Sequence, residues 1–308
     1  MKIFFMGTPQ AAIPSLGRLI DDGHDIKAVY TQPDRPSGRG VRIHESPVKV
    51  FACANRIPIY QPLKIKTVET LDAFRSHAAD VAIVVAYGRI LPDAFLHSFP
   101  KGAINLHFSL LPKYRGAAPV NWAIVKGETT TGVTTMQMDE GLDTGDILMQ
   151  RETAIRPAES SADLIMRLSV IGAELLSETL SSLDSLPRQP QDDSKASFAP
   201  ILNRADGVID WSMKASKIVN RVRGFQPFPT AYTYFSSSKL TIWRADEAAA
   251  IPKSPLPGTI IAAQYDDLQI QCGESVLRVK ELQLEGKRRL PVRDFLNGNH
   301  LPVGEVLG

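Results

Sequence analysis

The stretch DVAIVVA, residues 80–86, limits most strongly how this chain can fold. After its first residue it is apolar and rich in β-branched side chains, with no alternation of polar and apolar positions. A strand with one face in water would alternate, so this stretch predicts a strand covered on both faces. A helix predicted around residues 68–77 precedes it. We therefore expect an α/β fold with a doubly wound, mostly parallel sheet.

The pattern of strands and helices continues through the first two thirds of the chain. Strands are predicted at residues 2–6, 26–31, 103–107 and 131–138, and helices at 13–20 and 162–183. In such sheets, ligands bind at the carboxyl ends of the strands. We therefore look for a site in the turns that follow these strands.

The last third of the chain has a different pattern. The stretch SLPRQPQDDSKASFAPILN is rich in Pro, Ser and charge and lacks periodicity, which predicts an extended linker. A helix is predicted at residues 215–223, followed by short strands at 230–235, 239–245, 258–263, 268–272 and 276–283. Five short strands favour a small OB-like β-barrel. We expect a catalytic domain at residues 1–190, a linker at 191–205 and the OB-like domain at 206–308.

Composition is that of an ordinary globular protein, with 44% apolar and 22% charged residues. No apolar run approaches the roughly 20 residues of a membrane span, and the start predicts a first strand, so we expect a cytoplasmic protein. Cys53 and Cys272 lack metal-like spacing, and we expect both to be buried. Residues 204–308 are mildly basic, a pattern typical of a solvated surface as well as of a polyanion partner.

Gly7 follows the first strand, where nucleotide-binding folds place a glycine-rich turn. The sequence MGTPQAAIPSL lacks the further glycines of G-x-G-x-x-G and the G-K-[ST] of a Walker A loop. A dehydrogenase or a kinase is therefore not favoured. We expect Gly7 to serve close packing of strand and helix.

Asn105 and His107 lie two positions apart in a predicted strand, so their side chains leave the same face. Pro112 and Gly116 force the chain to turn soon afterwards. An amide can donate a hydrogen bond to a developing oxyanion, and an imidazole can move a proton near neutral pH. This pair suits attack of an amine on an activated acyl group. A structural pair, with capping and backbone hydrogen bonds, fits the pattern as well.

Four acids, Asp139, Glu140, Asp143 and Asp146, surround two glycines in MDEGLDTGDIL. A carboxylate near His107 would favour the protonated imidazole and fix its orientation. Spacing alone does not choose among the four, and a solvated polar turn is the alternative.

N-x-H followed by SLLPKYRG, with LDTGD about 35 residues further on, resembles the folate-dependent formyltransferases. The resemblance continues through FFMGTPQ, YTQPDRPSGRG, SPVK, VVAYGRILP, GAAPVNWAI, IDWS and PGTI. It is strongest to the members that formylate methionine on initiator Met-tRNA. It implies 10-formyltetrahydrofolate as cosubstrate, and neither a metal ion nor a nicotinamide. Asn105, His107 and Asp143 fall on the family's catalytic triad, whose nucleophile arrives with the substrate.

The resemblance also implies two sets of binding residues. The folate would lie against Tyr87, Gly88, Leu91, Ser109, Leu110, Leu111 and Pro112. The loop at residues 32–49 is basic and rich in Pro and Gly, which predicts flexibility and phosphate contacts. The tRNA contacts expected from the resemblance are Arg35, Arg39, Arg42 and Lys49 in this loop and Lys287, Arg288 and Arg289 in the C-terminal domain. Arg39 is the expected key contact with the acceptor stem.

Several alternatives share these features. A formyltransferase acting on glycinamide ribonucleotide or on an amino sugar nucleotide would use the same chemistry, but loop 32–49 and the barrel argue against both. Formyltetrahydrofolate hydrolase would use water with the same three residues. A non-catalytic RNA-binding protein retaining the fold is the alternative from another class. We expect a monomer, and we expect Phe108 to pack in the interior rather than to narrow the cleft.

Overall fold

A computed structural model describes residues 1–37, 42–249 and 255–308 of the chain. Its contacts divide the chain into two compact units, each built from three segments. The first unit comprises Met1–Pro119, Thr130–Ala154 and Ile165–Ala199, and the second comprises Val120–Thr129, Ile155–Leu164 and Pro200–Gly308. The expected linker is thus split, because its first half belongs to the first unit.

The first unit contains a seven-stranded sheet in the order β5-β2-β1-β6-β7-β8-β9. The strands are β1 (Lys2–Gly7), β2 (Asp25–Tyr30), β5 (Ile59–Tyr60), β6 (Val81–Val85), β7 (Ala103–His107), β8 (Thr130–Gln137) and β9 (Ile147–Ala154). Only β8 runs against the others, since it pairs antiparallel with both β7 and β9. The expected mostly parallel α/β sheet is confirmed. Every residue of β6 is buried, as the unbroken apolar run predicts.

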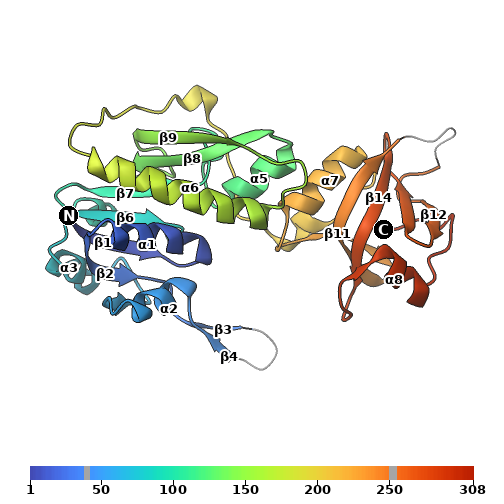
Figure 1. Ribbon diagram of the computed structural model, residues 1–308, viewed down its shortest axis with the longest axis horizontal. Coiled ribbons are helices and arrows are strands. Elements are labelled where there is room, and N and C mark those ends of the chain that lie inside the picture. The colour runs from blue at the N-terminus through green and yellow to red at the C-terminus, as the bar shows by residue number, and fades with distance from the viewer. Residues whose placement is uncertain (38–41, 250–254) are drawn as a thin grey trace. The chain divides into compact units, whose positions relative to one another are not determined.

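Helices cover both faces of this sheet. The helices that lie wholly or mainly in this unit are η1 (Gln10–Ala12), α1 (Ile13–Asp21), α2 (Pro47–Ala54), α3 (Val68–Ser76), α4 (Asp93–Leu96), α6 (Ser161–Ser181) and η2 (Asp193–Lys195). Phe74 of α3 and Phe95 of α4 pack in one cluster with Phe4 of β1. On the other face, α6 lies across the sheet (Figure 1), and a Cβ at Gly172 would collide with Leu106 of β7. Glycine therefore allows α6 to approach the strand closely.

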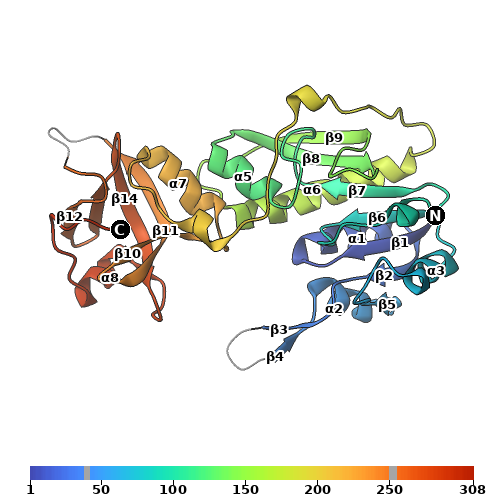
Figure 2. The same ribbon diagram turned by 180° about the vertical axis from the view of Figure 1, so that it is seen from behind.

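Two short strands, β3 (Arg35–Ser37) and β4 (Arg42–His44), form a hairpin beside α2 (Figures 1 and 2). The sequence predicted a flexible loop here and missed both the hairpin and α2. Ser46 caps α2 by accepting a hydrogen bond from the Lys49 backbone N–H at 3.1 Å, and Pro47 occupies the first turn. Cys53 on this helix is exposed, contrary to expectation, because it lies on the side away from the buried Val48 and Ala52.

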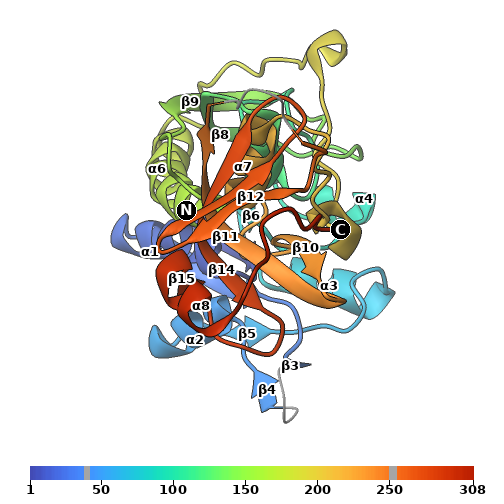
Figure 3. The same cartoon turned by 90° about the vertical axis from the view of Figure 1, so that its right-hand side faces the viewer.

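The second unit contains a six-stranded antiparallel sheet (Figure 3) in the order β10-β11-β14-β13-β12, with β15 paired to β14. Its elements are α5 (Pro119–Lys126), η3 (Arg204–Gly207), α7 (Ala215–Gly224), β10 (Ala231–Phe235), β11 (Ser238–Ala248), β12 (Ile260–Gln264), β13 (Asp267–Gln271), β14 (Val276–Leu284), β15 (Leu290–Pro291) and α8 (Val292–Gly298). The α7 side chains Ile218 and Val222 and the α8 side chain Phe295 enter the core of this sheet. Cys272 is buried there, as expected.

No helix within the described ranges 1–37, 42–249 and 255–308 is long and apolar enough to cross a membrane.

Candidate active site

Strand β7 places Asn105 and His107 on the same side of the sheet. Leu106, between them, points to the face that α6 covers, so its two neighbours point to the other face. Both side chains are nearly buried, with 9% of Asn105 and 6% of His107 exposed. Phe108, the next residue, is also buried and therefore does not narrow an open cleft.

His107 is held through one ring nitrogen. Its Nε2 lies 2.9 Å from the carbonyl oxygen of Tyr114. A carbonyl oxygen can only accept, so Nε2 carries the hydrogen and donates it. In the neutral ring, Nδ1 is then the free base. This nitrogen lies 3.7 Å from Oδ2 of Asp143, on the other side of the ring.

Asp143 lies in the loop between β8 and β9 and is brought to β7 by an unusual backbone conformation. Its φ is +54°, a left-handed value that Asp tolerates better than most residues. Its Oδ2 accepts a hydrogen bond from the backbone N–H of Gly116 at 2.8 Å, and its Oδ1 lies 3.4 Å from Nδ2 of Asn105. The structure thus brings Asn105, His107 and Asp143 together.

The other three acids of this loop do not reach the triad formed by Asn105, His107 and Asp143. Asp139 instead holds the loop closed, because its carboxylate accepts hydrogen bonds from the Thr144 hydroxyl at 2.7 Å and the Gly141 N–H at 3.1 Å. Glu140 is exposed. Asp146 contributes its backbone carbonyl to Gln137. The geometry therefore selects Asp143, which spacing alone could not.

This arrangement can hold, accept and stabilise a proton. Nδ1 of His107 lies toward the Asp143 carboxylate, so a proton at Nδ1 would sit beside a negative charge. The Asn105 side-chain amide carries two N–H groups. One is directed to Asp143, and the other can donate a hydrogen bond to an oxygen that gains negative charge. No serine or cysteine belongs to the triad, so a nucleophile must come from a substrate.

Tyr87, Gly88 and Leu91 follow β6. The Tyr87 carbonyl accepts hydrogen bonds from the Thr8 hydroxyl at 3.1 Å and the Gln32 amide at 3.0 Å. Gly88 has φ +81°, and a Cβ there would meet no atom within 4 Å, so space is open beside it. Burial raises the pKa of the Tyr87 hydroxyl, which keeps the phenol neutral. This open space suits a flat ring that approaches the backbone.

The turn after β7 is fixed from β8. Ser109 and Leu111 are buried, whereas Leu110 and Pro112 are partly exposed. The Thr134 hydroxyl donates to the Ser109 carbonyl at 2.6 Å and accepts from the Leu111 N–H at 3.2 Å. The turn is therefore a rigid wall beside the triad.

The predicted tRNA contacts near the N-terminus lie in or beside the β3–β4 hairpin. Arg35 and Arg42 belong to its two strands, and Arg39 lies outside the described residues. The Lys49 ammonium forms ion pairs with Asp34, just before β3, and with Glu45, just after β4. Hydrogen bonds to these carboxylates raise the pKa of Lys49 to about 12. Lys49 thereby ties both ends of the hairpin to α2.

The predicted contacts near the C-terminus lie in the turn between β14 and β15. Lys287 and Arg288 are exposed and line a hollow of about 310 Å³ together with Phe295. Arg289 already has partners, since its guanidinium pairs with Glu281 and lies 4.8 Å from the centre of the Trp243 ring.

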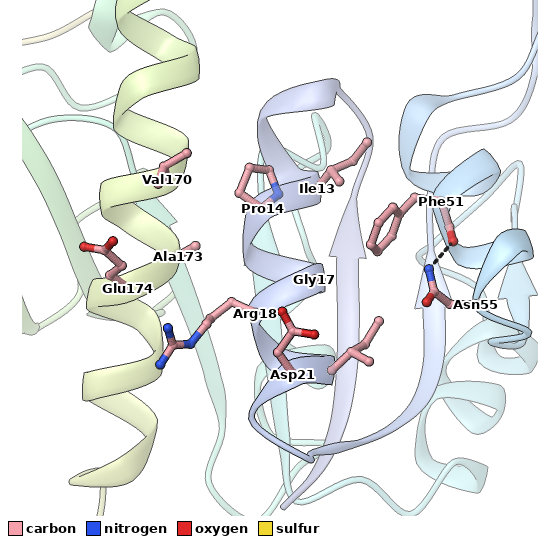
Figure 4. Close-up of a pocket in the computed structure, with 11 residues that line it drawn as sticks. Ile13, Pro14, Gly17, Arg18, Asp21, Phe51, Asn55, Val170, Ala173 and Glu174 are labelled. Atoms are coloured by element: carbon pink, nitrogen blue, oxygen red, sulfur yellow. Dashed lines mark hydrogen bonds between the residues drawn. The ribbon is translucent and has the colours of Figure 1, made fainter.

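A larger hollow, of about 460 Å³, lies between α1, α2 and α6 (Figure 4). Ile13, Phe51 and Val170 supply apolar surface, and Arg18 and Glu174 lie at its rim. No triad residue lines it. Among the described residues, no group of three or more His, Cys, Asp and Glu side chains could hold a metal ion.

Sequence reasoning missed the residues that hold the triad in place. Tyr114 and Gly116 supply the backbone groups that bind His107 and Asp143, and Gln191 holds the loop of Asp143. Tyr114 has φ +61°, a left-handed conformation that costs a non-glycine residue roughly 1–2 kcal/mol. The YRG sequence shows a turn, but nothing in it reveals which carbonyl meets the imidazole.

Comparisons with known proteins identify the family of the chain. The family model described as "Formyl transferase" matches residues 1–180, and the model described as "Formyl transferase, C-terminal domain" matches residues 201–300. A methionyl-tRNA formyltransferase from Geotalea uraniireducens is 48% identical over all of this chain and 98% of its own length. One from Solibacter usitatus is 45% identical over all of this chain and 99% of its own.

Solved structures share the fold. An N-formyltransferase from Helicobacter canadensis, in complex with folinic acid and dTDP-3-aminofucose, superimposes with a TM-score of 0.68 at 17% identity and covers 94% of this chain and all of its own. A sugar 3N-formyl transferase gives 0.67 at 20% identity, covering 94% of this chain and 99% of its own. The family models span both parts of the sequence, and the relatives match it from end to end. The chain belongs to the formyl transferase family.

Proposed function

We propose that the protein transfers the formyl group of 10-formyltetrahydrofolate to the amino group of methionine on initiator Met-tRNA. The observation that carries this proposal is the meeting of Asn105, His107 and Asp143 at one strand. It occurs in a chain that is 43–48% identical, along its whole length, to proteins named methionyl-tRNA formyltransferase. The product serves translation initiation.

The proposed roles follow from the geometry. The folate supplies the carbon that is transferred, and the methionine amine is the nucleophile. A bond would form between the amine nitrogen and the formyl carbon, and the bond between that carbon and the folate N10 would break. His107 takes up at Nδ1 the proton that the amine loses, because Nε2 is occupied by the Tyr114 carbonyl, and this proton would pass to N10 as tetrahydrofolate leaves. Asp143 stabilises the resulting imidazolium, and Asn105 donates a hydrogen bond to the formyl oxygen as negative charge develops on it.

We assign folate binding to the turn after β6 and the turn after β7. Tyr87, Gly88 and Leu91 would hold the pterin ring, and the open space beside Gly88 supports this placement. Ser109, Leu110, Leu111 and Pro112 would form the wall on the side of the triad, supported by the rigid hydrogen bonding of that turn.

We assign tRNA binding to two basic regions. The first region comprises Arg35 and Arg42 in the two strands of the hairpin, Lys49 in α2, and Arg39, which lies outside the described residues. The second comprises Lys287, Arg288 and Arg289 in the second unit. Arginine and lysine neutralise phosphates. We also infer that the second unit is an OB-like barrel, a fold that binds nucleic acids. Its five principal antiparallel strands support this inference.

We further infer a monomer that acts in the cytoplasm, where initiator tRNA is charged. The fold itself does not choose among acceptors, because the sugar formyl transferase matches 94% of this chain. Identity favours the tRNA acceptor, at 43–48% against 17–20% for the sugar enzymes.

Incubation of the protein with 10-formyltetrahydrofolate and charged initiator tRNA tests this proposal. Formyl-methionine should appear, whereas an amino sugar nucleotide or glycinamide ribonucleotide should stay unmodified. Loss of formyl groups to water at the same rate without any acceptor would favour a hydrolase.

A further inference from the structure

Residues 189–199, which the sequence places at the end of a domain and in a linker, belong to the first unit and form hydrogen bonds with Tyr114 and Asp143. Figure 2 shows this part of the chain in yellow, after α6. We propose that this segment, here called the brace, positions the catalytic side chains, and that Gln191 is the positioning residue for Asp143. The inference rests on the proposed catalytic role of Asp143.

Gln191 grips the backbone of the Asp143 loop with its side-chain amide. Its Nε2 donates to the carbonyl of Asp143 at 2.9 Å and to the carbonyl of Gly145 at 2.7 Å. These two carbonyls belong to the residues on either side of Thr144, so the Gln191 amide fixes the loop backbone at two points. Because Asp143 itself has a left-handed φ, its carboxylate direction depends on that backbone being held.

Arg115 in turn orients Gln191. The Arg115 guanidinium is 4% exposed and donates to Oε1 of Gln191 from Nε at 3.0 Å and from Nη2 at 2.8 Å. Nη2 also pairs with Asp193 of the brace at 2.8 Å. Both donors and both acceptor positions of the Gln191 amide are thus used, which leaves the amide one orientation.

The brace also holds the two backbone groups that bind the triad. The Tyr114 N–H donates to the Ser197 hydroxyl at 2.9 Å, and Arg115 exchanges backbone hydrogen bonds with Ser197 and Ala199. Tyr114 binds His107, and Gly116 binds Asp143. A Cβ at Gly116 would lie 2.7 Å from the Ala199 carbonyl oxygen, so the two backbones touch. One segment therefore supports the placement of both His107 and Asp143.

The experiment compares full-length Gln191→Met with Gln189→Met. Methionine keeps the length of the side chain but removes both amide donors. Gln189 is the matched control, because it lies in the same segment, its side chain is exposed, and its hydrogen bonds with Ile147 run between backbone groups that the substitution keeps.

We expect Gln191→Met to lower kcat by about 10- to 100-fold, since a displacement of about 1 Å at a reacting group can cost 10²-fold. KM for folate and for tRNA should stay within about twofold of the wild-type values, because the Gln191 amide is already fully used by Arg115 and by the carbonyls of Asp143 and Gly145. Gln189→Met should match the wild type. Gln191→Glu, which keeps an acceptor for Arg115 but lacks the two donors, should lose kcat as Gln191→Met does.

A double-mutant cycle with Asp143→Asn separates the inference from the proposed function. If Asp143→Asn keeps full activity, the catalytic assignment is wrong, and the inference falls with it. If Asp143→Asn is impaired but Gln191→Met behaves like Gln189→Met, only the brace is wrong. If the brace acts through Asp143, adding Gln191→Met to Asp143→Asn should cost less than about threefold. Losses that multiply, or a lower melting temperature with unchanged kcat, would overturn the inference.

Discussion

The two nitrogens of His107 have different surroundings, and this difference organises the site. Nε2 donates to the Tyr114 carbonyl, and Nδ1 faces the Asp143 carboxylate at 3.7 Å. The separation exceeds a direct hydrogen bond, so the pair acts by charge rather than by a preformed contact. The ring is therefore held by a hydrogen bond at one edge, while its other nitrogen lies near the Asp143 carboxylate without a direct hydrogen bond to it.

Replacing the imidazole tests this division of roles. We expect His107→Ala to lower the rate of formyl transfer by roughly 10²-fold or more, because general acid and base catalysis contributes about that much. Affinity for tRNA should be nearly kept. Single-turnover rates and tRNA binding measure the two effects, with His97→Ala as control because His97 is an exposed residue directly after α4. Turnover equal to that of the control would remove His107 from catalysis.

Arg39 is the residue that we propose as the key contact with the acceptor stem of the tRNA. Arg39→Ala should raise KM for initiator tRNA much more than it changes folate binding, because the guanidinium is proposed to meet the acceptor stem. Titration of each substrate separately measures both effects. Equal losses for folate and tRNA would contradict the assignment.

The sequence predicted part of this site for a simple reason. Strand alternation places Asn105 and His107 on one face whatever the rest of the chain does. Spacing alone left four acids open, and the family resemblance pointed to Asp143. The left-handed backbone and the Gly116 N–H that bring Asp143 to the triad are visible only in the structure. The prediction that Cys53 is buried was wrong, because α2 was not predicted and the exposed side of that helix was therefore unknown.

At the scale of elements, turns and loops position the site residues as much as strands do. The strand β6 was predictable because its five residues are apolar on both faces. The hairpin β3–β4 was not, because its strands are three residues each and polar. Most of the brace was predicted as part of a linker because its sequence has no periodicity. Its hydrogen-bond partners, among them Arg115 and Asp143, lie far away in the sequence.

The contact between Gly116 and Ala199 predicts a large effect from a single methyl group. Gly116→Ala should destabilise the protein by more than 1 kcal/mol, roughly the cost of left-handed strain, because the added Cβ also collides with the Ala199 carbonyl. Gly23→Ala is the control, since Gly23 has φ +76° but no atom within 4 Å of the added Cβ. Denaturant unfolding compares them, and equal losses would mean that the collision is relieved without cost.

The half-buried His77 makes stability depend on pH. His77 accepts or donates a hydrogen bond to the Tyr30 hydroxyl at 3.0 Å and packs against Phe4 and Tyr60. Burial lowers the pKa of His77 from its usual 6.5, so the unfolded state binds a proton more readily than the folded state. The stability that His77 contributes is therefore full above pH 6.5 and declines as pH falls below it.

Thermal unfolding at pH 8 and pH 5.5 tests this sign. The loss of melting temperature between the two pH values should be smaller in His77→Gln than in the wild type, because glutamine does not titrate. His97→Gln, at an exposed position, should lose as much as the wild type does. An identical loss in His77→Gln would show that His77 does not contribute to the acid sensitivity.

At the scale of the whole molecule, the division into units matters for experiments. Helix α5 and residues 155–164 belong with Pro200–Gly308, although they precede it by many residues in sequence. Asn121 of α5 donates to the Gly224 carbonyl at 2.7 Å, and Ser161 donates to the Gln226 carbonyl. Cutting the chain near residue 204 would remove these partners, so tRNA binding is better studied by substitution than by deletion.

Salt dependence measures the phosphate contacts directly. The double variant Lys287→Met and Arg288→Met should reduce the slope of log K against log salt by up to about 2, since each neutralised phosphate contributes about 0.9 on duplex nucleic acid. Folate binding should not change. The exposed pair Lys126→Met and Lys195→Met removes the same charge elsewhere and serves as control. An unchanged slope in the first variant would place the tRNA contacts elsewhere.

The central claim is that the triad passes a formyl group to methionine held on initiator tRNA, and a single comparison tests it most directly. The protein is incubated with 10-formyltetrahydrofolate and with initiator or elongator tRNA, both charged with methionine, and the released amino acid is analysed. We expect formyl-methionine from the initiator, far less from the elongator, and almost none from the initiator with Asn105→Ala. Equal formylation of the two tRNAs, or none of either, would contradict the account.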